Sequence, residues 1–262
     1  MSLESRSRAI GFFNCLNCRR PVAFGKIRGF ARERIEAFSA QCALLNRKFG
    51  SNIDLDFISR MTESLFLKDA APGWPFFGAR VRPGGETALT LYFTEIPWER
   101  RGWSNIERML GLFSLTAGDL AKCRLRGVFD CIGISFSSSG EKILKIYTKF
   151  PAPAKAGGLA FLEELHGARR LAFFKECLEI SKAHPARYWT NAYRFNGKQK
   201  KPVSVKTEVH FREPVPAEKL GKPFLSGSGF LAENQIGLLT GNDCAVTTLA
   251  AEKSHLTVYF TC

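Results

Sequence analysis

The sequence has 262 residues, of which 45% are hydrophobic, and its 38 Lys and Arg against 24 Asp and Glu leave a formal net charge of +14. The hydrophobic content excludes a disordered chain, and the length is sufficient to bury a core without disulfide bonds. The positive charge favours an anionic partner, such as a nucleic acid, a membrane surface or a phosphorylated small molecule. The aromatic residues are unevenly divided into 23 Phe, 5 Tyr and 4 Trp.

The beginning of the chain carries no clear targeting or metal signal. Its short apolar stretch is interrupted by polar residues and is a poor signal peptide, and no run of about 18 apolar residues predicts a membrane helix. Most of the eight cysteines lie in apolar patterns, which favours free thiols in a cytoplasmic protein. Cys15 and Cys18 lack a second pair at zinc-site spacing. We therefore predict no metal site and an irregular segment over residues 1–26.

From there the chain repeats a pattern of a helix followed by two strands. Apolar residues at intervals of three and four predict amphipathic helices, and Asn52 and Asp54 form a start signal for the second of them. Alternating runs joined by small and polar residues predict hairpins. The predicted helices are 35–49, 54–66, one that contains 106–113, 159–183 and 229–240. The predicted strands are 76–82, 86–95, 129–137, 142–150, 188–195, 203–211, 243–250 and 255–261.

The second strand of each hairpin has the same short pattern. These strands align at four residues separated by 55, 63 and 49 positions: Tyr92, Tyr147, His210 and Tyr259. Such spacing lies in the range of repeat architectures. The residue before each of them is aliphatic: Leu91, Ile146, Val209 and Val258. Because side chains alternate along a strand, the aliphatic residues share one face and the four aligned residues share the other.

The apolar stripes of the helices need cover, so we expect the aliphatic strand faces to pack against them. Four hairpins provide at least eight strands, which is enough to close a barrel whose interior is lined by the opposite, amphipathic face. We therefore predict one α+β domain over residues 1–262: an antiparallel β-barrel of helix-strand-strand units surrounded by a ring of helices.

Repeated units of this kind, with Lys-x-Tyr on inward-facing strands, resemble the ABBA-type aromatic prenyltransferases. Within that family the layout is most similar to the small soluble enzymes that prenylate cyanobactin-type ribosomal peptides. The resemblance covers about residues 30–262 and is strongest in CIGISFSSSGEKILKIYTKF at 131–150. The later hairpins, YWTNAYRFNGKQKKPVSVKTEVHF and CAVTTLAAEKSHLTVYFTC, match in layout. The resemblance implies a barrel that holds an allylic diphosphate.

A diphosphate carries about two to three negative charges, so a low-dielectric chamber that holds it needs cations and hydroxyl donors. The strand-borne candidates are Arg80, Arg82, Tyr92, Lys145, Tyr147, Lys206, His210 and Tyr259. Aromatic rings stabilise a developing allylic cation and exclude water, and the candidates for the prenyl and acceptor site are Phe136, Trp189 and Tyr193. The chain lacks a DDxxD metal motif, so Mg²⁺ would enter only with the diphosphate, and we expect no tightly bound cofactor.

The resembled peptide-modifying enzymes use a Glu on their first strand as a base. The corresponding segment here, PFFGARVR at 75–82, has no carboxylate, and the candidate replacements are Glu86, Asp130 and Glu208. The predicted reaction moves a dimethylallyl or geranyl group to a nucleophilic side chain of a cyclic peptide or to an aromatic small molecule, through a carbocation-like transition state.

Two other classes of protein fit the composition less well. A basic β-rich nucleic-acid-binding protein would explain the charge, but the cations are scattered over helices and turns, and no RNP-like or helix-turn-helix signature occurs. A barrel that only binds a hydrophobic ligand would not need cations in its interior. The KQKK run at 198–201 is either a solvated turn or a surface that steers an anionic substrate.

Overall fold

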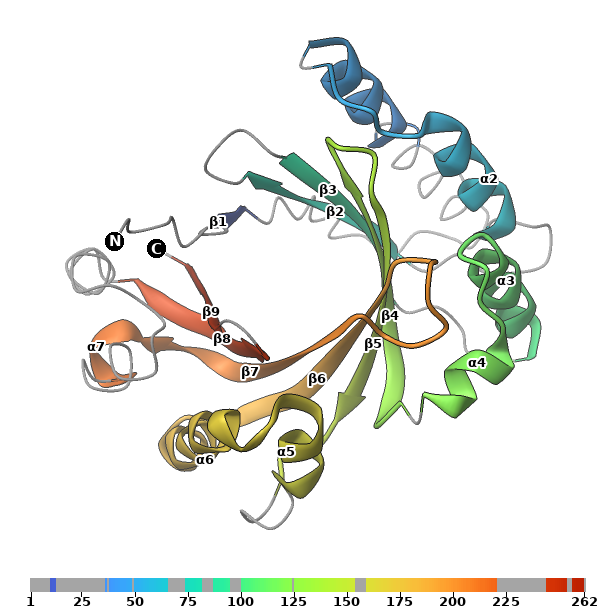
Figure 1. The fold of residues 1–262 in the computed structure, drawn as a ribbon. Coiled ribbons are helices and arrows are strands. Elements are labelled where there is room, and N and C mark those ends of the chain that lie inside the picture. The colour runs from blue at the N-terminus through green and yellow to red at the C-terminus, as the bar shows by residue number, and fades with distance from the viewer. Residues whose placement is uncertain are drawn as a thin grey trace, which may run out of the picture. The chain divides into compact units, whose positions relative to one another are not determined.

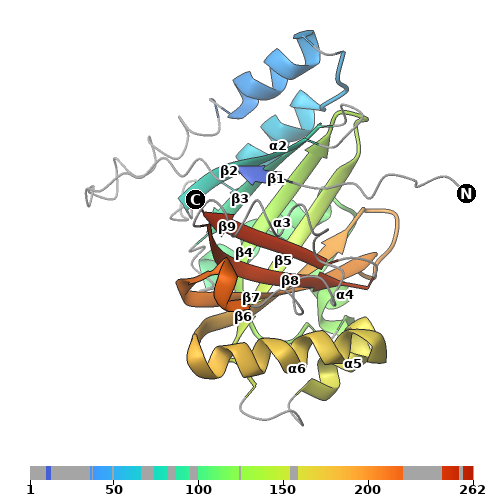
Figure 2. The same cartoon turned by 90° about the vertical axis from the view of Figure 1, so that its left-hand side faces the viewer.

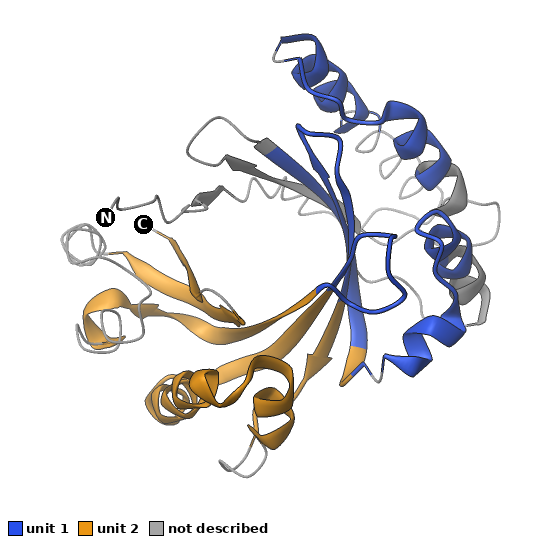
Figure 3. Cartoon of the chain, in the orientation of Figure 1, with its two compact units in different colours: residues 1–125, 129–146, 194–203 blue, residues 126–128, 147–193, 204–262 orange. Residues whose placement is uncertain are grey.

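The structure is a computed structural model of the chain. It describes residues 10–12, 36, 38–48, 50–65, 74–81, 87–94, 100–123, 125–153, 159–220, 244–253 and 256–261. Several predicted features lie outside these ranges: Arg82, Glu86, the Cys15 and Cys18 pair, and the helix at 229–240. The chain divides into two compact units, which are coloured in Figure 3 and described separately below. Unit 1 comprises 1–125, 129–146 and 194–203, and unit 2 comprises 126–128, 147–193 and 204–262.

Nine strands of the described residues form one sheet in which each strand neighbours the next along the chain (Figure 1). They are β1 (Ile10–Phe12), β2 (Trp74–Val81), β3 (Thr87–Thr94), β4 (Val128–Ser137), β5 (Lys142–Phe150), β6 (Ala186–Phe195), β7 (Ser204–Pro216), β8 (Ala245–Glu252) and β9 (Leu256–Thr261). The eight predicted strands are confirmed as β2 to β9. The irregular segment predicted over 1–26 contains β1, which pairs antiparallel with β2.

In unit 1, helices lie along one side of β3 and β4 (Figure 1). They are residues 38–48, α2 (Leu55–Leu65), α3 (Arg100–Gly111) and α4 (Ala117–Lys122). The predicted start signal of α2 is confirmed, because the carboxylate of Asp54 accepts a hydrogen bond of 2.8 Å from the backbone N–H of Phe57. The Phe57 ring then packs on Phe113 at 5.2 Å and on Phe136 at 6.0 Å between ring centres.

In unit 2, the helix predicted over 159–183 is interrupted. It consists of α5 (Ala160–His166) and α6 (Ala168–Ala183), with Gly167 between them at φ 82° and ψ 160°. Residues with a side chain rarely adopt this conformation, so the glycine separates two helices that periodicity alone had joined. Both helices lie on the same side of β6 (Figures 1 and 2).

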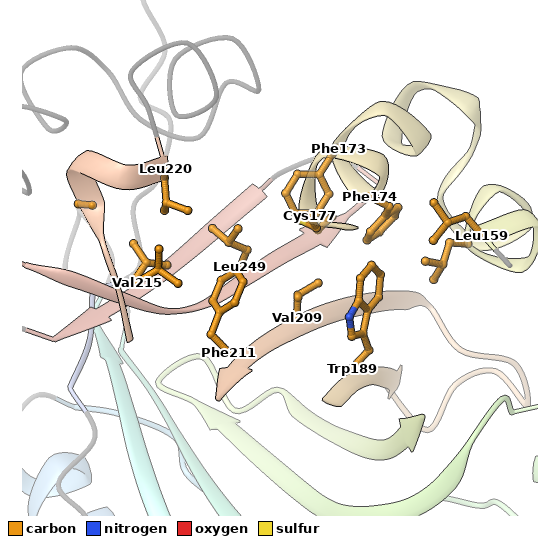
Figure 4. Close-up of a cluster of buried hydrophobic side chains, with 14 of the residues drawn as sticks. Leu159, Phe173, Phe174, Cys177, Trp189, Val209, Phe211, Val215, Leu220 and Leu249 are labelled. Carbon is orange, nitrogen blue, oxygen red and sulfur yellow. The ribbon is translucent and has the colours of Figure 1, made fainter. Parts of the chain in front are cut away.

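A buried apolar cluster joins α5 and α6 to the strands of unit 2 (Figure 4). Trp189 of β6 is fully buried, with its ring centre 6.0 Å from Phe174 of α6 and 6.2 Å from Phe150 of β5. The cluster continues through β7 and β8 to the short helix α7 (Ala217–Leu220). Burying a ring of this size contributes about 2–3 kcal/mol, so this cluster holds the helices against one face of the strands.

Among the cysteines that the structure describes, the prediction of free thiols is wrong at Cys244. Cys42, Cys123, Cys131 and Cys177 are free thiols, as expected, whereas Cys244 is disulfide-bonded. Within the described ranges, no helix has the length and apolar character needed to cross a membrane.

Gly127 allows β4 to begin close to the end of β5. Its φ is +97°, and a Cβ at this position would lie 2.6 Å from the carbonyl oxygen of Lys149. Because both the conformation and the space exclude a side chain, Gly127→Ala should lower the free energy of unfolding by about 2 kcal/mol or more. Gly111→Ala is the control, because nothing lies within 4 Å of its added Cβ. Equal denaturation midpoints for the two variants would contradict this prediction.

Candidate functional site

The two faces of β7, β8 and β9 differ in character. Val209 pairs with Leu249, which pairs with Val258, while His210 pairs with Thr248, which pairs with Tyr259. The aliphatic row belongs to the face that packs on the helices. The predicted separation of aliphatic and polar faces is therefore confirmed here, and the site candidates of unit 2 are found on the polar face.

Glu208 is the centre of a cluster on this polar face. One carboxylate oxygen lies 2.7 Å from Nζ of Lys206 and accepts from the Tyr259 hydroxyl at 3.5 Å. The other accepts from the Thr190 hydroxyl at 3.3 Å and lies 3.4 Å from Nε2 of His210. Nζ of Lys206 also donates to the Tyr259 hydroxyl. Each carboxylate oxygen thus has two polar neighbours, which a buried charge requires. We call these residues, together with Thr248, the Glu208 cluster.

The contacts of His210 identify its tautomer. Thr190 has one hydroxyl proton, which it donates to Glu208, so its oxygen accepts from Nε2 of His210 at 3.0 Å. In the neutral ring, Nε2 therefore carries the proton, and the lone pair of Nδ1 accepts from the Thr248 hydroxyl at 3.1 Å. The imidazole is held between two threonines, with its unprotonated nitrogen facing Thr248.

The charges of the cluster stabilise one another. Burial opposes ionisation of Glu208, but the charge of Lys206 and the hydrogen bond of His210 outweigh it and hold the pKa of Glu208 below its usual range. Burial likewise opposes the charge of Lys206, but the carboxylate of Glu208 and the oxygen of Tyr259 outweigh it and raise the pKa of Lys206. Burial raises the pKa of Tyr259, so its hydroxyl keeps its proton. At neutral pH, the cluster therefore holds an ammonium, a carboxylate and a phenol.

Removing one partner of this pair should be costly. The side chains of Lys206 and Glu208 are only 14% and 11% exposed, so Lys206→Met leaves a carboxylate buried beside fewer donors and should lower the free energy of unfolding by about 3 kcal/mol. The double variant Lys206→Met/Glu208→Gln removes both charges and should recover part of this loss. Denaturant unfolding of the two single variants and the double variant measures the coupling. Additive losses would contradict the prediction.

A second polar group lies in unit 1. The hydroxyls of Thr90 on β3 and Ser135 on β4 are 2.6 Å apart and buried. Nζ of Lys145 on β5 donates to the Thr90 hydroxyl at 3.4 Å and lies 6.0 Å from the centre of the Tyr92 ring. Two of the residues predicted to bind the diphosphate, Lys145 and Tyr92, are thus brought together beside hydroxyl groups. We call these four residues the Lys145 group.

A third polar chain crosses the helix-facing side of unit 2. Nε2 of His166 on α5 is hydrogen-bonded to the Thr207 hydroxyl at 2.7 Å, and Thr207 donates to Asn191 at 2.6 Å. Asn191 donates to the Tyr193 hydroxyl at 3.3 Å, which accepts from the backbone N–H of Arg126 at 3.0 Å. Apart from Nδ1 of His166, which is buried without a hydrogen-bond partner, these groups pair with one another inside the core, which is a structural role.

The buried polar chain that begins at His166 makes the stability of the protein depend on pH. Burial lowers the pKa of His166 from 6.5 to about 4. The unfolded chain therefore binds a proton here at pH values where the folded protein does not, and stability falls as the pH drops through this window. We expect a loss of about 2 kcal/mol between roughly pH 7 and pH 5, measured by denaturant unfolding. His166→Met should flatten this dependence, and an unchanged slope would refute the assignment.

The predicted aromatic contacts lie away from the polar face. Trp189 belongs to the apolar cluster, and Tyr193 shares its strand parity and joins the buried chain. Phe136 packs on Phe38 at 5.9 Å and on Phe57, on the helix side of unit 1. The prediction that these three rings form a prenyl or acceptor site is not supported by their positions, because strand alternation turns them toward the helices.

The other predicted residues are placed as follows. Asp130 is half-buried on β4, with the strand parity of the buried Ile132 and Ile134. Tyr147 is half-buried on β5, and Arg80 lies in β2 opposite Ala88. Arg82 and Glu86 lie outside the described residues.

Sequence reasoning missed four members of the polar face of unit 2. Thr190 and Thr248 belong to the Glu208 cluster, but threonine on a strand carries no distinctive signal. Tyr188 was not among the predicted site residues, yet its ring centre lies 4.7 Å from that of His210. Nζ of Lys149 lies 4.3 Å from the centre of the Tyr188 ring. Strand parity with Lys145 and Tyr147 could have identified Lys149.

The fold is similar to that of solved aromatic prenyltransferases. No protein-family model matches the sequence, and no curated protein matches it. The structure of 5-dimethylallyltryptophan synthase from Streptomyces coelicolor in complex with DMASPP and Trp superposes with a TM-score of 0.66 at 16% identity, covering 90% of this chain and 71% of that one. The PriB prenyltransferase complex with L-tryptophan and dimethylallyl thiolodiphosphate gives 0.64 at 13% identity, covering 85% and 67%.

A third structure is 6-dimethylallyltryptophan synthase from Micromonospora olivasterospora, with a TM-score of 0.59 at 12% identity, covering 84% of this chain and 67% of that one. At these identities the likeness concerns the fold. The α+β fold class predicted from the repeated helix-strand-strand units is therefore confirmed: the chain has the fold of the ABBA-type aromatic prenyltransferases.

Proposed function

We propose that this protein is a prenyltransferase that moves a dimethylallyl or geranyl group from its diphosphate to an aromatic acceptor. The observation that carries the proposal is the likeness of fold, over 90% of the chain, to a structure in complex with DMASPP and Trp. That acceptor is a free amino acid, which favours an aromatic small molecule. A side chain of a cyclic peptide, as in the resembled cyanobactin-type enzymes, is the other acceptor to be tested.

The Lys145 group is the proposed diphosphate site. An allylic diphosphate leaves as an anion, and a half-buried lysine beside hydroxyl groups stabilises that charge more strongly than an exposed one does. Lys145 has Thr90 at hydrogen-bond distance and Tyr92 near its ammonium group. Tyr147 is two residues along the same strand, and Arg80 and Arg82 are further candidates. Mg²⁺, if used, would arrive with the diphosphate.

Among the three proposed carboxylates, Glu208 has the best support. It lies on the polar face and keeps its negative charge at neutral pH, because Lys206 and His210 lower its pKa despite burial. Asp130 has the strand parity of helix-facing residues, and Glu86 is outside the described residues. Glu208, in its cluster with Lys206, His210 and Tyr259, is therefore the preferred candidate among the proposed carboxylates.

The nucleic-acid alternative receives less support from this arrangement. A phosphate-binding surface presents lysines and arginines to solvent. Lys206 is 14% exposed and is paired with Glu208 at 2.7 Å, so its charge is already neutralised inside the protein.

The direct test is to incubate the purified protein with dimethylallyl or geranyl diphosphate, with and without Mg²⁺. Acceptors should include tryptophan, simple indoles and phenols, and cyclic peptides that contain Trp or Tyr. We expect a mass increase of one isoprene unit with the first donor and two with the second. Absence of any product or prenyl alcohol, together with no binding of either diphosphate, would refute the proposal.

Lys145→Ala should impair the use of the diphosphate. Loss of a charge-assisted hydrogen bond costs about 1.5–3 kcal/mol, so we expect KM for the diphosphate to rise by about 10- to 100-fold, with a smaller effect on KM for the acceptor. Lys182→Ala is the matched control, because its side chain is 72% exposed on α6. Steady-state kinetics with each substrate varied in turn gives the comparison. A wild-type KM for the diphosphate in Lys145→Ala would show that Lys145 does not belong to the site.

A further inference from the structure

We propose that His210, and not Glu208, takes the proton that the acceptor loses, through the hydroxyl of Thr248, while Glu208 holds the imidazole and stabilises the charge that it acquires. This inference rests on the proposed prenyl transfer and adds the proton acceptor for it. It also changes the expected part of His210, which the sequence had suggested as a ligand of the diphosphate.

Both carboxylate oxygens of Glu208 are already engaged by polar neighbours. Its two oxygens face four polar groups: Lys206 and Tyr259 on one, and Thr190 and His210 on the other. A carboxylate in such surroundings is a weak base, because each contact stabilises its ionised form. Its side chain is also only 11% exposed, whereas that of His210 is 24% exposed. The imidazole is therefore the more accessible of the two groups.

The two nitrogens of the His210 imidazole face different partners. In the neutral ring, Nε2 carries the proton toward Thr190 and Glu208, so the lone pair is on Nδ1. That lone pair faces the Thr248 hydroxyl at 3.1 Å. A carboxylate behind one nitrogen and an available lone pair on the other is the arrangement by which a histidine acts as a general base. Thr248, which lies opposite His210 on the same face, is therefore the group through which Nδ1 would receive the proton.

Charged and aromatic groups from four strands surround the imidazole of His210. Glu208 and Lys206 come from β7, and their opposite charges offset each other at 2.7 Å. Tyr259 of β9 is paired with Thr248 in the sheet and keeps its proton. From β6, Tyr188 places its ring 4.7 Å from the imidazole, and Lys149 of β5 lies on that ring. A cationic imidazole formed during the reaction thus has Glu208 as its closest counter-ion.

The proposed step balances in atoms and charge. The acceptor's nucleophilic atom forms a bond to the allylic carbon, whose bond to the diphosphate oxygen breaks with its electron pair. The proton of the acceptor passes to the Thr248 oxygen as the Thr248 proton passes to Nδ1. The products are the prenylated acceptor, the diphosphate anion and a protonated His210, which returns its proton to solvent.

The test separates prenyl transfer from ionisation of the donor. Ionisation of the diphosphate followed by capture of water gives a prenyl alcohol and needs no base on the acceptor. His210→Ala should therefore lose about 100-fold in kcat for transfer, with alcohol formation maintained and binding of the diphosphate unchanged. Added imidazole should restore part of the transfer. Thr248→Val should behave like His210→Ala, while Thr248→Ser keeps the hydroxyl and should stay close to the wild type.

A substitution at a second histidine provides the control for His210→Ala. His184, a half-buried histidine at the end of α6, provides the matched control, and His184→Gln should keep kcat for transfer near that of the wild type. If His210→Ala unfolds, the Thr248 Val and Ser variants answer the same question. Wild-type protein that forms neither product nor alcohol refutes the proposed function. Transfer that survives in His210→Ala or Thr248→Val refutes the relay alone.

Discussion

The polar face of unit 2 depends on one constraint, which is that the carboxylate of Glu208 is nearly buried and must be surrounded by donors. Strand β7 itself supplies two of these donors, because residues two positions apart share a face: Lys206 lies on one side of Glu208 and His210 on the other. The neighbouring strands add Thr190 from β6 and Tyr259 from β9. A change at any of these positions leaves a charge or a hydroxyl without its partner in a region of low dielectric.

The same alternation explains which parts of the site could be predicted. The repeated aliphatic residues Leu91, Ile146 and Val209 are buried, as the repeat indicated. The polar face of unit 2, with Glu208 and His210, therefore followed from the sequence. Trp189 was misplaced because an aromatic residue suits either face of a strand. Its neighbour Thr190 has the opposite parity and belongs to the polar face, but nothing in a lone threonine reveals that before the register is known.

Hydrophobic periodicity also failed to predict a helix end that depends on the backbone conformation of a single residue. The helical pattern runs without a break across 159–183, and only the conformation of Gly167 divides it into α5 and α6. The division has a consequence for the core, because it ends α5 at His166, whose ring then faces Thr207 at 2.7 Å. Local pattern therefore located the elements, whereas tertiary contacts determined which polar groups they bury.

Comparison of equivalent positions in the repeat suggests how one fold separates two kinds of chemistry. The residue two positions before the aligned Tyr or His is Lys145 in one hairpin and Glu208 in another. A strand-borne ammonium beside the Thr90 hydroxyl attracts an anion. A carboxylate at the same place neutralises Lys206 and leaves an imidazole with a counter-ion, which suits proton transfer instead. In the proposed reaction, exchanging one charged residue for its opposite at this repeat position gives the two hairpins different parts: stabilisation of the leaving group for Lys145, and deprotonation of the acceptor for the hairpin of Glu208 and His210.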